Sequence, residues 1–252
     1  MLHFDDIAFG PIFSRRLGSS LGVNILPSKG KLCNFDCIYC ECGWNKDGVG
    51  DKVFPRTEDV RRALSAKLKS CADAGTPIDS ITFSGNGEPT LNPDFPEIVD
   101  VTLELRDRYY PDAKVSVLSN ATMAGKPEVF AALRKVDNPI LKLDAPSDAG
   151  VRTVNRPSGH YSVEDTVRSL ERFNGDFVLQ TMFLKSPEYD SSAEESLRQW
   201  MDIVRSLKPR EIMVYTIDRE TPQKDIQKFS AAQMEEMVRP LVEEGFMVQV
   251  RG

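Results

Sequence analysis

Three cysteines lie close together in the segment Cys33-Asn-Phe-Asp-Cys37-Ile-Tyr-Cys40. Three thiolates on one short loop can bind three corners of a cubane iron–sulfur cluster and leave the fourth iron without a protein ligand. Soft thiolates also bind zinc or copper, so a structural zinc site with a fourth ligand elsewhere is the alternative. The sequence has five cysteines, an odd number, and this favours metal or redox chemistry over a disulfide framework.

The remaining two cysteines are not expected to be ligands. Cys42 follows the third cysteine by two residues, but a fourth thiolate would block the open iron. Cys71 falls in a predicted helix among Ala and Lys residues, where a cysteine behaves as a small hydrophobic residue. We expect Cys42 to lie beside the site as a bystander and Cys71 to be structural.

A second motif, Ser84-Gly-Asn-Gly-Glu-Pro-Thr90, ends a predicted strand. Its two glycines allow the backbone to approach a ligand closely. The carboxylate of Glu88 can accept a charge-assisted hydrogen bond from a cationic amine. An ordinary strand-to-helix loop is the alternative interpretation. The predicted binding turn consists of Gly85, Asn86, Gly87, Glu88 and Pro89.

Further polar side chains occur within or just after predicted strands. An unpaired polar group buried in a parallel strand costs about 1 to 3 kcal/mol, so such a side chain must face a partner or a lined cavity. For the lysine of this set, a salt bridge near Asp144 is an equally good explanation. These residues are Ser119, Asn120, Lys142, Asp144 and Gln180.

Three arginine-containing segments are also candidates. Arg156 lies in Asn155-Arg-Pro-Ser-Gly159, and its planar fork suits a carboxylate of cofactor or substrate. A solvated surface loop is the alternative, and the segment 217–222 belongs to the same class. Arg15 and Arg16 could contact a phosphate, a peptide carboxylate or only water, at the mouth or the base of a barrel.

The elements that must position these residues alternate along the chain. Apolar, β-branched runs predict six strands, and each is followed by a helical stretch. Parallel neighbours need long crossover connections, which helices supply. We therefore predict an α/β fold, a partial (β/α)6 barrel of parallel strands in a single domain over residues 1–252, with function at the carboxyl ends of the strands. The predicted strands are 21–26, 80–84, 114–119, 140–144, 177–184 and 211–217, and the predicted helices are 57–74, 93–108, 126–136, 162–173, 192–207 and 230–244.

The cysteine spacing, with an aromatic residue before the third cysteine and a first strand before the loop, resembles the radical S-adenosylmethionine (SAM) superfamily. The resemblance implies a 4Fe-4S cluster on Cys33, Cys37 and Cys40, whose open iron is chelated by SAM. It also implies that Tyr39 lies beside the adenine and that the turn 85–89 binds the methionine amino group. Ser119, Asn120, Lys142, Asp144 and Gln180 resemble positions that contact ribose and carboxylate.

The implied reaction is reductive cleavage of SAM to a 5′-deoxyadenosyl radical, which abstracts hydrogen from a substrate. The electron would come from a reductant such as flavodoxin or ferredoxin. The segments 10–24, 33–42, 84–90, 155–157 and 215–218 resemble the group named after wyosine (tRNA imidazoG) synthetase. No cysteine precedes Cys33 to hold that group's second cluster. A glycyl-radical-enzyme activating enzyme, acting on a peptide loop, is the alternative within the enzyme class, and an iron–sulfur electron carrier or zinc-dependent binding module is the alternative outside it.

The composition limits the kinds of partner that we expect the protein to bind. The formal net charge is −6, so no global positive field attracts nucleic acid, although a local basic patch can still exist. The sequence has no apolar run long enough to span a membrane and no signal-peptide pattern at its start. We therefore expect a cytoplasmic protein with no membrane partner, acting on a small molecule, a peptide or a tRNA.

Overall fold

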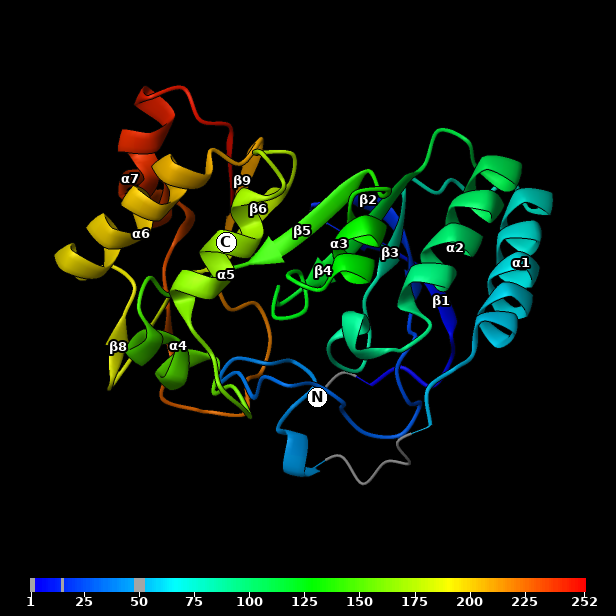
Figure 1. Cartoon of the computed structure of the whole chain (residues 1–252), viewed down its shortest axis with the longest axis horizontal. Helices are drawn as coiled ribbons and strands as arrows, with labels where there is room; N and C mark the ends of the chain where they lie inside the picture. The colour runs from blue at the N-terminus through cyan, green and yellow to red at the C-terminus, as the bar shows by residue number, and fades with distance from the viewer. Residues whose placement is uncertain (1–2, 15, 48–52) are drawn as a thin grey trace.

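The structure is a computed structural model that describes residues 3–14, 16–47 and 53–252, so Arg15 lies outside the described residues. Within them, the main sheet has eight strands in the order β1-β2-β3-β4-β5-β6-β9-β11. Only β1 is antiparallel to its neighbour; the other pairs are parallel, as predicted. The sheet curls into an open half-barrel, which confirms the predicted partial barrel (Figure 1). The strands are β1 (Ala8–Ser14), β2 (Gly18–Val23), β3 (Ser80–Phe83), β4 (Lys114–Ser119), β5 (Asn138–Lys142), β6 (Val178–Met182), β9 (Glu211–Tyr215) and β11 (Val248–Arg251).

All six predicted strands are present, as β2 to β6 and β9. The sequence analysis missed the two outermost strands, β1 and β11, which extend the sheet at its two edges. It also missed a small antiparallel sheet in the order β10-β7-β8, formed by β7 (Leu184–Ser186), β8 (Tyr189–Asp190) and β10 (Gln227–Lys228).

Helices cover the outer face of the curled sheet, with α1 to α3 beside one half and α5 to α7 beside the other (Figure 1). The six predicted helices are present, and the short α4 was not predicted. Hydroxyl caps begin several of them: Ser162 accepts a hydrogen bond from the Asp165 N–H, and Ser230 forms a reciprocal capping box with Gln233. The helices are α1 (Thr57–Asp73), α2 (Phe95–Tyr109), α3 (Pro127–Leu133), α4 (Asp148–Val154), α5 (Val163–Glu171), α6 (Glu194–Leu207) and α7 (Ala231–Glu243).

Alternation along the strands separates two environments. Residues such as Leu141, Leu179 and Val214 belong to the large buried core that also includes helix residues. Their neighbours on the opposite face form a separate inner cluster of Ile140, Val178 and Met213. The next residues on that inner face, two positions further along each strand, are Lys142, Gln180 and Tyr215, so the inside of the barrel changes from apolar to polar toward the carboxyl ends.

The hairpin of β1 and β2 contributes to the inside of the barrel. Leu17, in the turn between these strands, packs against the inner cluster of Ile140, Val178 and Met213. Leu17 therefore forms part of the apolar floor beneath the polar layer. The pairing of β1 with β2 shifts register between Phe9 and Ile12, around Pro11.

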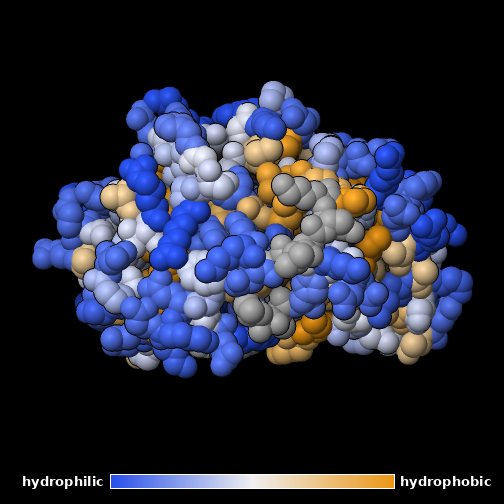
Figure 2. All heavy atoms as spheres, turned by 90° about the horizontal axis from the view of Figure 1, so that it is seen from below, coloured by the Kyte–Doolittle hydropathy of each residue, from blue (hydrophilic) through white to orange (hydrophobic). Residues whose placement is uncertain are grey.

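The outer surface is mostly polar. No helix in the described part of the chain is long and apolar enough to cross a bilayer. Viewed from below, the molecule is largely hydrophilic, and hydrophobic side chains gather toward the middle of this face (Figure 2).

Candidate active site

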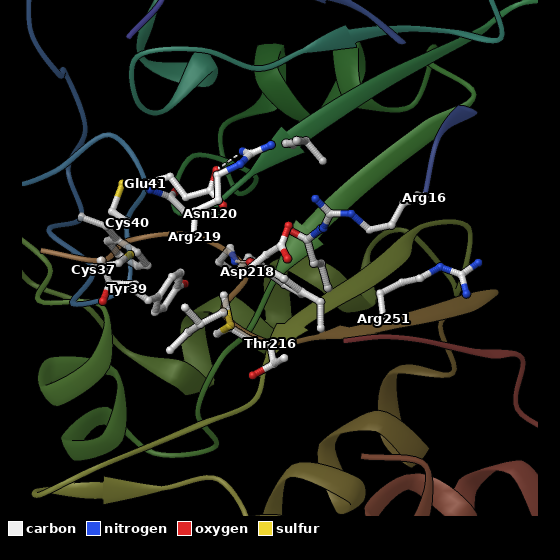
Figure 3. Close-up of a pocket in the computed structure, with 18 of the residues that line it drawn as sticks. Arg16, Cys37, Tyr39, Cys40, Glu41, Asn120, Thr216, Asp218, Arg219 and Arg251 are labelled. Atoms are coloured by element: carbon white, nitrogen blue, oxygen red, sulfur yellow. Dashed lines mark hydrogen bonds and ion pairs between the residues drawn. The ribbon is translucent and has the colours of Figure 1, made fainter. Parts of the chain in front are cut away.

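A cavity of about 530 Å³ opens where the carboxyl ends of the strands meet the cysteine loop. Figure 3 shows the cysteine loop at one end of this cavity and Arg16 and Arg251 at the other, with Asp218 and Arg219 between them. The structure therefore brings together residues from widely separated parts of the sequence. The predicted site residues that line the cavity are Cys33, Cys37, Tyr39, Cys40, Gly87, Glu88, Ser119, Asn120, Lys142 and Gln180.

Five predicted residues are not among those that line the cavity: Gly85, Asn86, Pro89, Asp144 and Arg156. The amide of Asn86 donates to the carbonyls of Phe4 (2.8 Å) and Pro27 (3.0 Å), which ties the turn to the N-terminal segment. The Arg156 guanidinium lies over the ring of Trp44 and donates to the side-chain oxygen of Gln223. Arg156 thus interacts with neighbouring loops.

Two of the three predicted cysteine ligands already receive N–H hydrogen bonds at sulfur. The Phe35 N–H and the Asn120 amide donate to Cys33 Sγ, at 3.4 and 3.8 Å. The Asn155 amide donates to Cys37 Sγ at 3.3 Å. N–H donors that point at cysteine sulfur stabilise the thiolate form and any metal centre that it holds.

A buried cation lies beside the same loop. The side chain of Lys31 is 2% exposed and donates to Asp36 Oδ1 (3.2 Å) and to the Gly43 carbonyl (3.0 Å). Burial lowers the pKa of Lys31, but the thiolates of the loop and Asp36 outweigh this effect and raise it above the ordinary value. Lys31 therefore stays charged and supplies a permanent positive charge behind the three sulfurs.

The three thiols differ in acidity. The pKa of Cys40 is lowered, chiefly by its side-chain interaction with Cys42, and the charge of Lys31 adds to this effect against burial. Burial raises the pKa of Cys37 to about 11, and burial together with the charge of Glu88 raises that of Cys33 further. Metal binding to these sulfurs must therefore displace protons from Cys33 and Cys37.

The two cysteines not expected to be ligands occupy different places. The Cys42 thiol donates to the Gly85 carbonyl at 3.4 Å, and its interaction with Cys40 raises its own pKa. It lies beside the site but is not a lining residue of the cavity. Cys71 is buried in the main core on α1.

The chemistry of the cysteine side chains and of their surroundings fits an iron–sulfur cluster. Across residues 3–14, 16–47 and 53–252, no three His, Cys, Asp or Glu side chains are grouped so that they could hold a single metal ion. In a cubane cluster each thiolate binds a different iron. Soft thiolates, N–H donors at sulfur and a buried ammonium fit an anionic iron–sulfur centre.

The glycine turn is joined to the cysteine loop through the backbone. The Leu32 N–H donates to the Asn86 carbonyl (2.7 Å), and the Glu88 N–H donates to the Leu32 carbonyl (3.1 Å). Gly87 between them has φ +136°, and a Cβ at this position would lie 1.9 Å from the Leu32 carbonyl oxygen. Only glycine fits both this conformation and this close approach.

We expect Gly87→Ala to lower the stability of the protein by about 1 to 3 kcal/mol or more, because it adds backbone strain and forces Leu32 away from the turn. The matched control is Gly159→Ala, where a Cβ meets nothing within 4 Å. Urea denaturation of both variants measures the difference. Equal stability of Gly87→Ala and the parent would show that the bridge between turn and loop is unimportant.

Glu88 is held by hydrogen bonds within the protein. Glu88 as a whole is 2% exposed. Oε1 accepts from Thr90 N (3.1 Å), Thr90 Oγ1 (2.6 Å) and Ser119 Oγ (2.9 Å). Within the described part of the chain, Oε2 accepts only from Asn120 N (2.7 Å). Burial raises the pKa of Glu88, and these donors oppose that rise. A carboxylate has about four acceptor positions, so Oε2 retains capacity for one more donor from the cavity.

Tyr39, Asn155 and Asp144 form a second buried network. The side chain of Asp144 is fully buried and accepts from the Tyr39 hydroxyl, from the Asn155 amide (2.6 Å) and from the Met182 N–H (2.9 Å). Lys142 Nζ lies 3.6 Å from Asp144 and also bonds the Tyr215 hydroxyl. Both interpretations of Lys142 therefore hold in geometry: it is ion-paired to Asp144 and it lines the cavity.

Several residues around the cavity were missed by the sequence analysis. The fold brings Lys31 and Asn155 next to the cysteine loop. Arg251 lines the cavity from β11, a strand that was not predicted. The only sequence signal was the position of Asn155 beside the singled-out Arg156. Arg16, left undecided, lines the cavity, as do the residues of 217–219 and Thr221.

Comparisons with known proteins agree with this geometry. The Radical SAM superfamily model matches residues 28–199. A UPF0026 protein of Helicobacter pylori (strain J99) is 30% identical over 219 residues, which cover 84% of this chain and 67% of that protein. The chain thus spans about two thirds of this relative's length.

Two solved structures show a similar fold. Streptococcus suis SuiB bound to S-adenosylmethionine aligns with a TM-score of 0.66 at 17% identity, covering 92% of this chain and 50% of SuiB. TYW1 with a lysine-pyruvate adduct bound aligns with a TM-score of 0.63 at 14% identity, covering 92% of this chain and 76% of TYW1. At these identities the similarity is one of fold alone, and this chain spans about half the length of SuiB.

Proposed function

The chain belongs to the radical SAM superfamily and is one of its enzymes, and we propose that Cys33, Cys37 and Cys40 bind the superfamily's 4Fe-4S cluster. When bound, the reduced cluster and SAM supply reductive cleavage of the cofactor's sulfur–C5′ bond and a 5′-deoxyadenosyl radical for hydrogen abstraction. The observation that carries this proposal is the shared cavity: the three thiols and Glu88 line it together, and the backbone joins their two loops.

The residues around the sulfurs have distinct tasks in this proposal. Asn155 and the Phe35 N–H orient Cys37 and Cys33 and donate toward their sulfurs. Lys31 offsets negative charge from behind the loop. Together they hold three thiolates in a buried place where unpaired negative charge is otherwise unfavourable.

We expect Lys31→Met to lower the reduction potential of the cluster by about 60 mV or more, the equivalent of a tenfold change for one electron. Reduction adds negative charge, and the variant lacks the buried cation that stabilises it. Potentiometric titration followed by electron paramagnetic resonance checks the shift at matched iron content. The control is Lys29→Met, which removes a lysine from an exposed position in the segment before the loop. An unchanged potential in Lys31→Met would contradict the assigned charge role.

The binding of SAM is proposed on the adjoining wall. Glu88 accepts the methionine ammonium at Oε2, Gly87 lets the backbone approach, and Tyr39 presents its ring toward the adenine. Ser119 and Asn120, at the end of β4, lie next to this carboxylate and provide polar contacts for the cofactor. Pro89, Gly85 and Asn86 shape the turn, and Asp144 fixes Tyr39. A contact of Arg156 with a carboxylate stays a prediction.

The finer grouping with wyosine synthetase is also a proposal, supported by the sequence segments named above and by the fold likeness to TYW1. The proposal concerns the one cluster on Cys33, Cys37 and Cys40. A substrate from tRNA or a peptide, and a flavodoxin or ferredoxin as electron donor, belong to the same proposal. A single domain over residues 1–252 remains the proposed organisation.

Anaerobic reconstitution with iron and sulfide, followed by reduction with dithionite in the presence of SAM, tests the function. We expect 5′-deoxyadenosine and methionine in equal amounts. Zinc binding with no reducible cluster would favour the binding module, and a cluster that neither binds nor cleaves SAM would favour the electron carrier.

A further inference from the structure

Two residues that line the cavity each have a buried hydrogen-bond donor with no partner among the residues that the structure describes. Gln180 is 4% exposed, and its side-chain Nε2 is buried without a hydrogen bond. One guanidinium nitrogen of Arg16, Nη1, is also buried and unpaired. Both residues line the cavity. Buried polar groups in folded proteins are almost always paired, so two such donors in one cavity indicate a missing acceptor.

These donors belong to one polar layer above the floor. Gln180 on β6 is the register neighbour of Lys142 on β5. The ring of Tyr215 connects this side to the hairpin, because Lys142 Nζ lies 4.8 Å and the Arg16 guanidinium carbon 4.9 Å from its centroid. Leu17, next to Arg16, packs into the apolar cluster beneath and fixes the turn. Figure 3 places Arg16 at the end of the cavity away from Cys37 and Cys40.

Besides Arg16, several charged side chains that line the cavity have partners of their own, and Asp218 is one of them. Lys142 is ion-paired to Asp144, and Arg219 is paired to Glu41 at 2.6 Å. In the part of the chain that the structure describes, no carboxylate forms an ion pair with Arg16. A guanidinium N–H and an amide N–H that lack partners in one cavity match an oxyanion, which can accept from both.

We propose that Arg16 and Gln180 bind an oxyanion, a carboxylate or phosphate, of the substrate at the floor of the barrel. This inference rests on the proposed function, because it assumes that SAM occupies the end beside the cysteines. A cavity of about 530 Å³ is sized for one moderate ligand. Beside SAM it therefore accepts only a small part of a substrate. Gln180, placed with the cofactor from sequence, then contacts the substrate instead.

The test titrates acetate and inorganic phosphate separately into the unreduced holoprotein saturated with SAM, and calorimetry measures affinity. We expect at least one anion to bind and the affinity to fall by at least about 30-fold in Arg16→Met, because a buried charged partner is removed. The anion that binds identifies the oxyanion. Gln180→Leu should weaken anion binding while leaving the melting temperature of the anion-free protein equal or higher, since it removes an unpaired buried group.

The control is Arg219→Met, which removes the same charge from the same cavity where it is already paired to Glu41. Anion affinity in this variant should change little. The proposal is overturned if neither anion binds the parent, if Arg219→Met loses affinity as Arg16→Met does, or if Arg16→Met loses SAM affinity equally. Iron content and SAM binding measured on the same parent sample separate failure of the proposed function from failure of this site.

Discussion

Cys33→Ala, Cys37→Ala and Cys40→Ala are each expected to reduce iron binding to background and to abolish cleavage of SAM. In the proposed site each thiolate holds a different iron, so the two remaining ligands cannot also bind the iron that loses its cysteine. The loss should be nearly complete in each variant because a cluster with two protein ligands is not retained. Iron and sulfide content after anaerobic reconstitution, then the yield of 5′-deoxyadenosine, measure the effect.

Cys42→Ala and Cys71→Ala are the matched controls, because each removes one thiol from the same chain. Cys71 lies in the core on α1, away from the cavity lining. Cys42 donates its thiol hydrogen to the Gly85 carbonyl and interacts with Cys40, so its loss removes these contacts and leaves three ligands. Both controls should keep the cluster. Loss of iron in Cys42→Ala would overturn the choice of ligands.

Glu88→Ala is expected to weaken SAM binding by at least about 30-fold while the cluster is retained. Removing one partner of a desolvated charge-assisted hydrogen bond typically costs about 2 to 5 kcal/mol. Glu88→Gln should be milder, about tenfold, because an amide oxygen still accepts but lacks the charge. Titration of the reduced cluster's electron paramagnetic resonance signal with SAM measures the affinity, after iron content has been matched.

A further control separates the effect of the Glu88 charge from the effect of Glu88 in holding the turn. Glu88→Ala also leaves Ser119, Asn120 and Thr90 without their acceptor. Thr90→Val keeps the Glu88 charge and removes only the 2.6 Å hydroxyl contact to Oε1. If Thr90→Val weakens SAM binding as much as Glu88→Gln, Glu88 acts by holding the turn and does not bind the cofactor ammonium directly.

The fold was predictable where local pattern and tertiary role agree. The strands β3 to β6 and β9 are short, apolar and rich in β-branched residues, as buried parallel strands require. The edge strand β1 reads Ala8-Phe-Gly-Pro-Ile-Phe-Ser14, in which Gly10 and Pro11 indicate a turn. The helix α4 has seven residues, as α3 does, but it includes Gly150 and the β-branched Val151, Thr153 and Val154, which are weak helix formers.

Much of the site was predictable because its residues follow strands. The cysteine loop and Glu88 lie together as expected from their order along the chain. Lys31 and Arg16 were not predictable, because their roles depend on contacts across the fold. Lys31 lies in a polar loop, where its sequence context does not distinguish it from a surface lysine. Arg16 approaches Tyr215 because the hairpin of β1 and β2 folds beneath the polar layer. Propensity and spacing contain no information on such long-range contacts.

The irregular outermost strand has a consequence for self-association. An exposed sheet edge presents unpaired N–H and C=O groups that can recruit a strand from another molecule, and this leads to aggregation. Strand β1 forms such an edge, but Pro11 lacks an N–H and the register shift between Phe9 and Ile12 interrupts its hydrogen-bonding pattern. Strand β1, which its Gly and Pro made hard to predict from sequence, is therefore a poor template for intermolecular β-sheet, even though its Phe13 is 81% exposed.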